Sequence, residues 1–237
     1  MLFAVDGLSK RFGRIAALTG VSFQVRAGEV LGLIGPNGAG KTTLFECLAG
    51  GLPLDAGAVR VNGQPVTPRD RASLLIYLPD GIAPWPSQSV RWAIDFTLGF
   101  FGGPCSLRDE VVEQLGITPL LDRPIGALSK GQRKRALLAM GLLTPHPVLL
   151  ADEPFDGLDL RQTREVAATL RAHARRGRTL FLSIHQIADA ARVCDRFVLL
   201  SSGRVCGEGT LDELSTGAAS RPGGGSLDLE EVFLALT

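Results

Sequence analysis

The sequence has few aromatic residues and no excess of charge of one sign. Its 237 residues include 25 Lys and Arg against 24 Asp and Glu, so the net charge is +1. A balanced charge gives no general electrostatic attraction to nucleic acid or anionic lipid. An aromatic content of 6% argues against recognition of single strands by base stacking. We therefore expect no nucleic-acid partner.

The chain also lacks an apolar run long enough to span a membrane. A spanning helix needs about 20 consecutive apolar residues, and the best candidate, residues 136–151, is interrupted by Pro145 and Pro147. Residues 1–13 carry Asp6 early and their basic residues late, which is not the order found in a signal peptide. We expect a chain that neither crosses a membrane by itself nor is exported.

Cysteines are few and show no metal-site or redox spacing. None of the four forms a CxxC pair or has a histidine at ligand spacing; they are Cys47, Cys105, Cys194 and Cys206. Free, reduced thiols that pack as small core residues of a cytosolic protein are the expectation.

Glycine is abundant, with 29 residues, which predicts tight turns or close approach of the backbone to a ligand. Short apolar runs, typical of strands buried on both faces, alternate with helical periodicities. Strands are predicted at 21–25, 30–34, 59–61, 74–78, 148–151, 179–184 and 197–200, and helices at 42–48, 90–101, 107–115, 136–143 and 160–176.

Strands that alternate with helices predict an α/β fold with a mostly parallel central sheet. We expect an N-terminal antiparallel β-subdomain and an inserted α-helical subdomain at 85–145, with the α/β core at 1–84 and 146–216. Residues 217–226 are rich in Gly and Ser and predict a linker. Residues 227–237 predict a closing helix.

One segment between a predicted strand and a predicted helix matches the P-loop pattern G-x-x-x-x-G-K-[ST]. It consists of Gly35, Pro36, Asn37, Gly38, Ala39, Gly40, Lys41, Thr42 and Thr43. Glycines let backbone N–H groups surround phosphates, and the helix N-terminus adds a positive field. Lys41 would reach the β- and γ-phosphates, and the Thr42 hydroxyl would hold Mg²⁺. The alternative is a Gly-rich turn with a chance lysine.

An acidic pair follows the apolar strand at 148–151. Asp152 is suited to hold Mg²⁺, and Glu153 to polarise an attacking water as general base. The alternative is a solvated acidic pair at a strand end. A GTPase is excluded, because its guanine reader Asn-Lys-x-Asp is absent: Asn37 and Asn62 are each followed by Gly.

The sequence Leu128-Ser129-Lys130-Gly131-Gln132 lies before this acidic pair and resembles the LSGGQ signature of the ABC ATPase family, with Ser129 placed 23 residues before Asp152. Residues 154–159 are similar to the D-loop of the family, which includes Asp159. His185 looks like its switch histidine, and Phe12 stands where the family stacks an aromatic ring on adenine. Taken singly, Ser129 is a helix cap, His185 a surface residue and Phe12 a core residue.

The resemblance covers nearly the whole chain and implies a P-loop NTPase, one ABC ATPase domain over 1–237, with ATP and Mg²⁺ as cofactors. Lys41, Glu153 and His185 would be catalytic. Ser129, Lys130, Gly131, Gln132 and Asp159 would contact the nucleotide across an interface, and Thr42 and Asp152 would bind the metal.

Two positions depart from the family pattern. The family places Gln after the strand that leads into the helical subdomain, and here Asp80 follows Tyr77-Leu78-Pro79. Asp80 is therefore a candidate metal ligand that adds a negative charge near the γ-phosphate; the alternative is that Gln88 takes this role. Lys130 replaces the first glycine of the signature, either offsetting phosphate charge or pointing to solvent.

The resemblance also implies partners. Because each motif occurs once, two ATPs would bind between this chain and a second ABC ATPase subunit, in a homodimer or a heterodimer. An integral membrane permease would hold the pair at the inner face of the cell membrane, with contacts near residues 80–92. The ending 229–237 resembles ATPases of exporters, and 35–50 resembles those of amino-acid importers; we favour export. The alternatives are a soluble ABC ATPase or a regulatory nucleotide-binding module.

Overall fold

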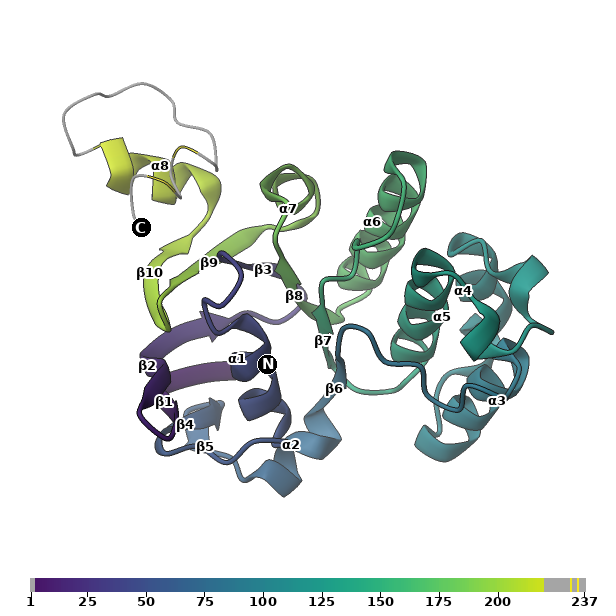
Figure 1. Ribbon diagram of the computed structural model, residues 1–237, viewed down its shortest axis with the longest axis horizontal. Helices are drawn as coiled ribbons and strands as arrows, with labels where there is room; N and C mark the ends of the chain where they lie inside the picture. The colour runs from purple at the N-terminus through teal and green to yellow at the C-terminus, as the bar shows by residue number, and fades with distance from the viewer. Residues whose placement is uncertain (1–2, 220–230, 232–233, 235–237) are drawn as a thin grey trace.

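The computed structural model describes residues 3–219, 231 and 234, which form a strand-rich body and a lobe of helices beside it (Figure 1). The strands are β1 (Phe3–Phe12), β2 (Ile15–Val25), β3 (Val30–Ile34), β4 (Ala56–Val61), β5 (Gln64–Pro65), β6 (Leu75–Leu78), β7 (Val148–Asp152), β8 (Thr179–Ile184), β9 (Arg196–Ser201) and β10 (Arg204–Gly209). The helices are α1 (Lys41–Ala49), α2 (Pro68–Leu74), α3 (Val90–Phe101), α4 (Arg108–Gln114), α5 (Lys130–Leu142), α6 (Leu160–Arg175), α7 (Ile187–Val193) and α8 (Leu211–Ala219).

The larger sheet has six strands in the order β10-β9-β3-β8-β7-β6. All neighbouring strands in it are parallel except β10, which pairs antiparallel with β9. Every residue of β3, β7 and β8 is buried, because helices or a second sheet cover both faces of these strands. The mostly parallel central sheet predicted from the apolar runs is confirmed.

Alternation along the strands divides the hydrophobic core in two. Val30 and Ile34 of β3 pack in one cluster with α3 to α7, whereas Leu31 and Leu33 pack in a second cluster with α1 and the smaller sheet. In the second cluster Phe181 of β8 contacts the ring of Phe45 on α1 at a centroid distance of 4.9 Å. The two cores hold the P-loop helix and the helical lobe on opposite faces of one sheet.

The smaller sheet is the expected antiparallel β-subdomain, with the order β2-β1-β4-β5. It begins with a long hairpin of β1 and β2, of which the sequence predicted only residues 21–25 of β2. The register of this hairpin shifts at three places, so apolar and polar residues do not alternate evenly along it. The irregular pairing explains why most of these two strands were not predicted.

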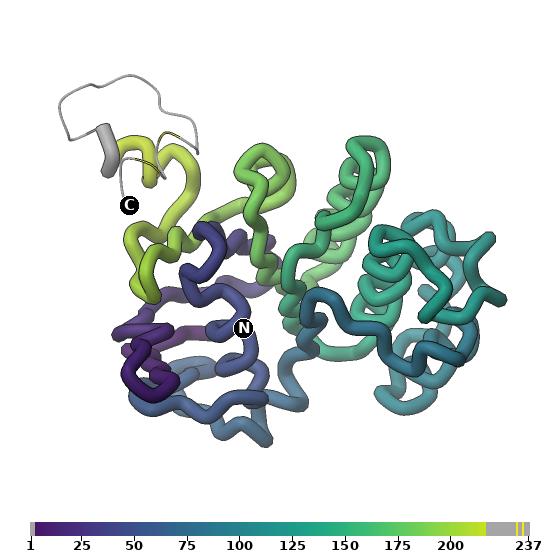
Figure 2. Tube along the Cα trace, viewed as in Figure 1, coloured from purple at the N-terminus to yellow at the C-terminus, as the bar shows by residue number. Residues whose placement is uncertain are grey.

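The helical lobe is formed by α3, α4 and α5; the chain leaves the sheet after β6 and returns at β7 (Figure 2). Helix α3 spans the predicted residues, with Ser89 as N-cap, its hydroxyl accepting a hydrogen bond from the Trp92 amide, and Gly102 as C-cap. Helix α5 begins at Lys130, six residues before the predicted start at residue 136. The prediction missed these first turns because they are polar and carry no apolar periodicity.

Helices α2, α7 and α8 and strand β10 were not predicted. Helix α8 runs to Ala219, so the start of the linker expected at 217–226 is helical instead. Of the closing helix expected at 227–237, only Glu231 and Leu234 are described, and both are helical.

Within the described residues, no helix is both long and apolar enough to cross a membrane. Cys47 and Cys194 are buried, but Cys105 is exposed and Cys206 partly exposed, so the cysteines are not all core residues.

Candidate active site

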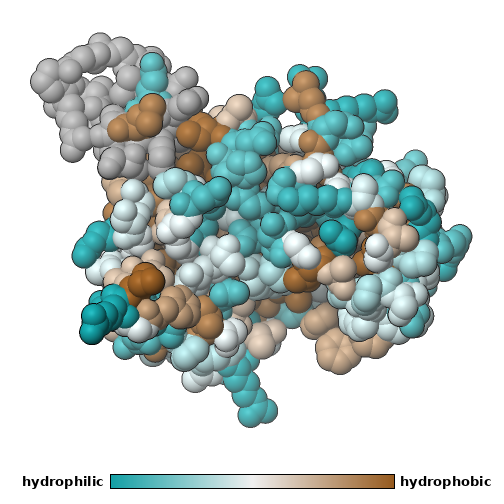
Figure 3. All heavy atoms as spheres, viewed as in Figure 1, coloured by the Kyte–Doolittle hydropathy of each residue, from teal (hydrophilic) through white to brown (hydrophobic). Residues whose placement is uncertain are grey.

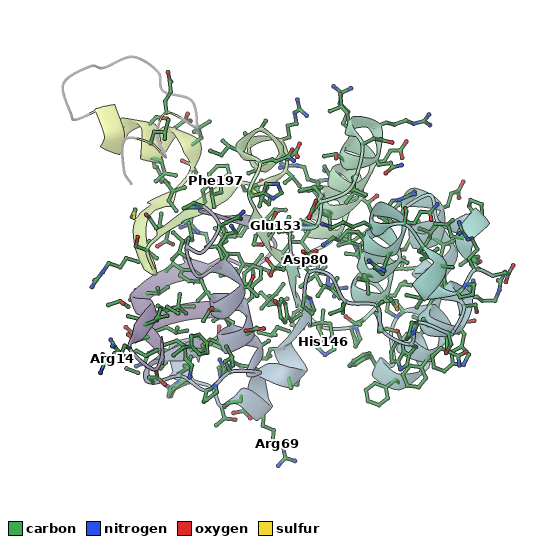
Figure 4. All side chains as sticks on the ribbon, in the orientation of Figure 1. Arg14, Arg69, Asp80, His146, Glu153 and Phe197 are labelled. Atoms are coloured by element: carbon green, nitrogen blue, oxygen red, sulfur yellow. The ribbon has the colours of Figure 1, made fainter. Side chains whose placement is uncertain are left out.

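Four neighbouring parallel strands, β3, β8, β7 and β6, deliver polar residues to one edge of the central sheet. The P-loop follows β3, and His185 follows β8. Asp152 ends β7 and Glu153 comes directly after it, and Asp80 follows β6. Because the carboxyl ends of parallel strands meet at one edge, residues far apart in sequence gather there, as in other open α/β sheets. Figure 4 shows Glu153 and Asp80 near the middle of the molecule, beside the helical lobe.

The P-loop curls back over the start of α1. Lys41 is the first residue of the helix, and its buried Nζ donates hydrogen bonds to the carbonyl oxygens of Gly35 at 2.7 Å and Pro36 at 3.4 Å. Gly40 caps the helix at a φ of 103°, a left-handed conformation that favours glycine. The loop therefore places an ammonium group and the helix N-terminus at one point, a suitable site for a polyphosphate.

Two glycines of the P-loop serve different purposes. A Cβ on Gly35 would lie 2.3 Å from the carbonyl oxygen of Leu200, whereas a Cβ on Gly38 would meet no atom of the described residues within 4 Å. Gly35 thus permits the loop to pack against β9. Gly38, at a φ of 82°, leaves open space in front of the loop, where a ligand would lie.

Asp152 is held by hydroxyl groups on both carboxylate oxygens. Thr42 Oγ1 donates to Oδ2 at 2.7 Å, and the buried hydroxyl of Ser183 on β8 donates to Oδ1. The Tyr77 hydroxyl lies 3.5 Å from Oδ2, and burial together with the Asp152 charge raises the pKa of Tyr77. The pair of Thr42 and Asp152 presents hard oxygen donors of the kind Mg²⁺ prefers.

Glu153 stands where the P-loop and the end of β8 meet. Its backbone takes a φ of 50°, a strained conformation for a residue with a side chain, and its amide donates to the Ser183 carbonyl and hydroxyl, each at 3.1 Å. Oε1 lies 3.7 Å from Lys41 Nζ, and Oε2 lies 2.5 Å from His185 Nδ1. One carboxylate therefore contacts both other predicted catalytic residues.

A cleft of about 500 Å³ opens at this edge. The predicted site residues that line it are Pro36, Asn37, Gly38, Gly40, Lys41, Thr42, Thr43, Asp80, Asp152 and Glu153. Ile15, Ala16, Ala17, Ser202 and Gly203 also line it, and sequence reasoning missed them, because nothing in the β1–β2 and β9–β10 turns marks them as neighbours of the P-loop. Gly35, Ala39 and His185 are not among the residues that line the cleft.

Phe12, predicted to stack on adenine, is half-exposed and outside the cleft lining. Its ring lies 5.6 Å from Lys10 Nζ. Ile15, across the β1–β2 turn, is 71% exposed and does line the cleft. Because Phe12 is the direct strand partner of Ile15, it lies next to the mouth of the cleft, and its stacking on adenine stays a prediction.

The signature segment, residues 128–132, lies outside this cleft as well. Ser129 caps α5: its hydroxyl accepts a hydrogen bond from the Gln132 amide, and Gln132 Oε1 accepts one from the Ser129 amide. A Cβ on Gly131 would lie 2.4 Å from the carbonyl oxygen of Gly157. The signature is therefore packed against the D-loop of its own chain, residues 154–159.

The two departures from the family pattern both form ion pairs. Lys130 pairs with Asp156 of the D-loop, and its predicted contact with a phosphate held by a partner subunit stays a prediction. Asp80 Oδ1 lies 2.7 Å from Lys134 Nζ on α5.

Asp159 caps α6, its side chain accepting a hydrogen bond from the Gln162 amide at 2.8 Å. Gln88, the alternative to Asp80, does not line the cleft.

Comparisons with known proteins agree with this geometry. Residues 18–156 match the model of the ABC transporter family. The chain is 39% identical over 225 residues to the hemin import ATP-binding protein HmuV of Streptomyces coelicolor, covering 90% of this chain and 80% of that protein. It is 33% identical to the Nod factor export ATP-binding protein I of Ralstonia nicotianae, covering 91% and 69%. A solved ATP-binding subunit of an ABC transporter superposes with a TM-score of 0.88 at 26% identity, covering 100% and 99%.

Proposed function

The chain belongs to the ABC transporter family, whose ATP-binding domains hydrolyse ATP, and from this premise we propose that it is the ATP-hydrolysing subunit of a transporter with a separate membrane permease. The observation that carries the proposal is the convergence of Lys41, Asp152 and Glu153 on one cleft. Its volume is within the range of small-molecule sites.

In this proposal the P-loop binds the phosphates of ATP. The Lys41 ammonium, now held by two carbonyl oxygens and near Glu153, would turn to the β- and γ-phosphates. Thr42 and Asp152 would hold Mg²⁺, and their two oxygens are too few for a complete cage, which suits an ion that also takes phosphates and waters as ligands. Bound Mg²⁺ would offset the charge of the phosphates.

Glu153 is our candidate for the general base, because its carboxylate lies beside the lysine that reaches the γ-phosphate. A base there would accept the proton of the attacking water. His185 holds Oε2 of this carboxylate from both its ring and its backbone amide. It would thus keep Glu153 in place through the reaction.

A second ABC ATPase subunit, which is either another copy of this chain or a sister chain, would complete the site. The residues proposed to bind and hydrolyse ATP line the cleft, namely Lys41, Thr42, Asp152 and Glu153, whereas Ser129, Gly131 and Asp159 lie outside it. Because the signature segment does not reach the ATP bound by its own chain, it can contact the ATP bound by a partner subunit. ATP bound by both subunits would stabilise the closed pair, and hydrolysis would release it.

The permease would dock on the helical lobe beside the loop that carries Asp80. Rings of Trp85, Trp92 and Phe96 are in mutual contact there, and all three are about 40% exposed. Trp85 and Phe101 also line an apolar pocket of about 120 Å³. Exposed aromatic groups over an apolar pocket favour a protein partner. This contact would place the chain at the inner face of the cell membrane.

We propose export as the direction, on the resemblance of residues 229–237 to exporter ATPases. The test begins with the purified chain: steady-state hydrolysis of ATP with Mg²⁺ is the expected result, and binding without turnover would favour the regulatory module. Capture of the tagged chain from solubilised membranes should then recover a multispan permease. Transport into or out of vesicles that contain both proteins decides the direction, and absence of any permease would favour a soluble ATPase.

A further inference from the structure

Lys134 joins three parts of the fold at the back of the cleft. It lies in the second turn of α5, and its Nζ is 2.7 Å from Asp80 Oδ1 in the loop that leads into the helical lobe. The same ammonium donates to the backbone carbonyl oxygen of Asp152 at 3.1 Å. One side chain therefore connects the signature helix, the entry loop and the end of β7.

This ammonium is almost removed from water, since the Lys134 side chain is only 7% exposed. An ammonium buried to that extent is costly unless a charged or polar group compensates it. Asp80 is the carboxylate that does so here, with the Asp152 carbonyl as second acceptor. The position of Lys134, and with it the start of α5, thus depends on the charge of Asp80.

Asp80 has a matching need for Lys134. It lines the cleft together with Asp152 and Glu153, so a third carboxylate faces the region where the terminal phosphate of ATP would lie. Asp80 Oδ1 forms an ion pair with Lys134 Nζ at 2.7 Å. Without that partner, the Asp80 carboxylate would repel the phosphates of ATP.

We propose that Lys134 is a positioning residue that forms a net-neutral unit with Asp80, at the place where the family has a neutral glutamine. The pair would remove the repulsion between Asp80 and ATP and would fix the distance between the signature helix and the cleft. This inference rests on the proposed function of the cleft as an ATP site. The pairing with Lys134 explains why an acidic residue, Asp80, is tolerated at the position of the glutamine.

The charge match predicts opposite defects in the two single variants. Lys134→Gln leaves a bare carboxylate in the cleft, so ATP affinity should fall about tenfold, and ADP affinity should fall less because ADP carries one negative charge fewer. Asp80→Gln leaves the buried ammonium unpaired, so the melting temperature should fall. The double variant Asp80→Gln/Lys134→Gln carries neither charge and should recover both properties. Lys134→Arg, which keeps the charge, should retain most ATP affinity.

The experiment measures ATP and ADP affinities by displacement of a fluorescent nucleotide at fixed ionic strength, and unfolding by heat. Asp95→Asn is the matched control, because Asp95 forms a 2.7 Å ion pair with Arg108 inside the helical lobe and does not line the cleft. This control should leave both affinities unchanged. A purely structural role of Lys134 would lower ATP and ADP affinities equally.

Additive losses in the double variant would overturn the proposal, and so would loss of the folded state in the double variant. If the unaltered chain bound no ATP, the proposed function would fall. The unfolding measurements would then still test the ion pair of Asp80 and Lys134. If the two charges compensate each other, the double variant must be more stable than Asp80→Gln.

Discussion

The Glu153 carboxylate accepts a hydrogen bond from the backbone amide of His185 at 3.2 Å, and its Oε2 also lies 2.5 Å from the His185 ring nitrogen Nδ1. The two residues come from the ends of β7 and β8, which are hydrogen-bonded neighbours in the sheet. Sheet register, rather than sequence distance, thus sets the position of the candidate base. The positive φ of Glu153 lets the chain turn immediately after the strand, where the carboxylate reaches Lys41.

Replacement of Glu153 should separate hydrolysis from binding. We expect Glu153→Gln to slow turnover by about 10²–10⁴-fold, because an amide cannot accept the proton of the attacking water, while ATP affinity is retained. Light scattering with saturating ATP should then show a dimer. Glu165→Gln on the exposed face of α6, where Glu165 pairs with Arg161, is the control and should behave as the unaltered chain. Near-normal turnover of Glu153→Gln would exclude the assignment.

Removal of the Thr42 hydroxyl should change the magnesium dependence. Thr42→Val keeps the shape of the side chain but deletes the oxygen that bonds Asp152 at 2.7 Å. We expect the Mg²⁺ concentration for half-maximal ATPase activity to rise at least about tenfold, since one of the two protein oxygens near the ion is lost. Thr118→Val, at an exposed position of the helical lobe that does not line the cleft, is the control. An unchanged Mg²⁺ titration for Thr42→Val would remove Thr42 from the metal site.

The two glycines of the P-loop should fail in different ways when replaced by alanine. Gly35→Ala places a Cβ 2.3 Å from the Leu200 carbonyl oxygen, so we expect a loss of about 1–3 kcal/mol in unfolding free energy. The Cβ of Gly38→Ala meets no atom within 4 Å in the described part of the chain. The strain of its left-handed backbone should cost about 1 kcal/mol, and its main effect should be weaker ATP binding. Urea unfolding and nucleotide titration of both variants give the comparison, and equal effects on both would contradict it.

Much of the sheet could be predicted from the sequence because buried parallel strands leave uninterrupted apolar runs. Residues 179–184 and 90–101 were predicted with the bounds that the structure has. The elements that were missed lack such a signal: the β1–β2 hairpin has a shifting register, and the short helix α2 is held by a capping box at Thr67 and Asp70 rather than by an apolar face.

The residues of the candidate site also fall into those that could be predicted from the sequence and those that could not. The P-loop and the acidic pair could be found because a local pattern carries their chemistry. Ile15 and Lys134 could not, since each reaches the site only through tertiary packing that joins distant segments. The partners of Asp80 and Lys130 were missed for this reason too: an ion pair between residues 54 or 26 positions apart has no signature in one sequence.

His173 on α6 should make stability depend on pH. Burial, helped by the charges of Arg178 and Arg176, lowers the pKa of His173 to about 4. Below the unfolded pKa of about 6.5 the unfolded chain binds a proton that the folded chain refuses, so stability falls as the pH drops from 6.5 towards 4. We expect a loss on the order of 1 kcal/mol at pH 5 after allowance for screening. His173→Gln should flatten this dependence in urea unfolding at pH 7 and 5, and an unchanged slope would contradict the assignment.

The ion pair of Lys130 and Asp156 should matter for hydrolysis rather than for folding. Both side chains are partly exposed, so breaking the pair should change the unfolding free energy by less than about 1 kcal/mol. Neither residue lines the cleft, and ATP binding to the single subunit should be unaffected by Lys130→Met or Asp156→Asn. Turnover should nevertheless fall, because the pair fixes the signature against the D-loop, and both segments would meet the nucleotide of the partner.

A double-mutant cycle on the ATPase rate separates this role from two independent effects. If Lys130 acts through Asp156, the double variant Lys130→Met/Asp156→Asn should be no slower than the slower single variant, because the second change removes an interaction that is already lost. Rates that multiply would instead mean that each residue contacts the partner on its own. Lys130 would then offset phosphate charge directly, and its pairing with Asp156 would belong only to the subunit without its partner.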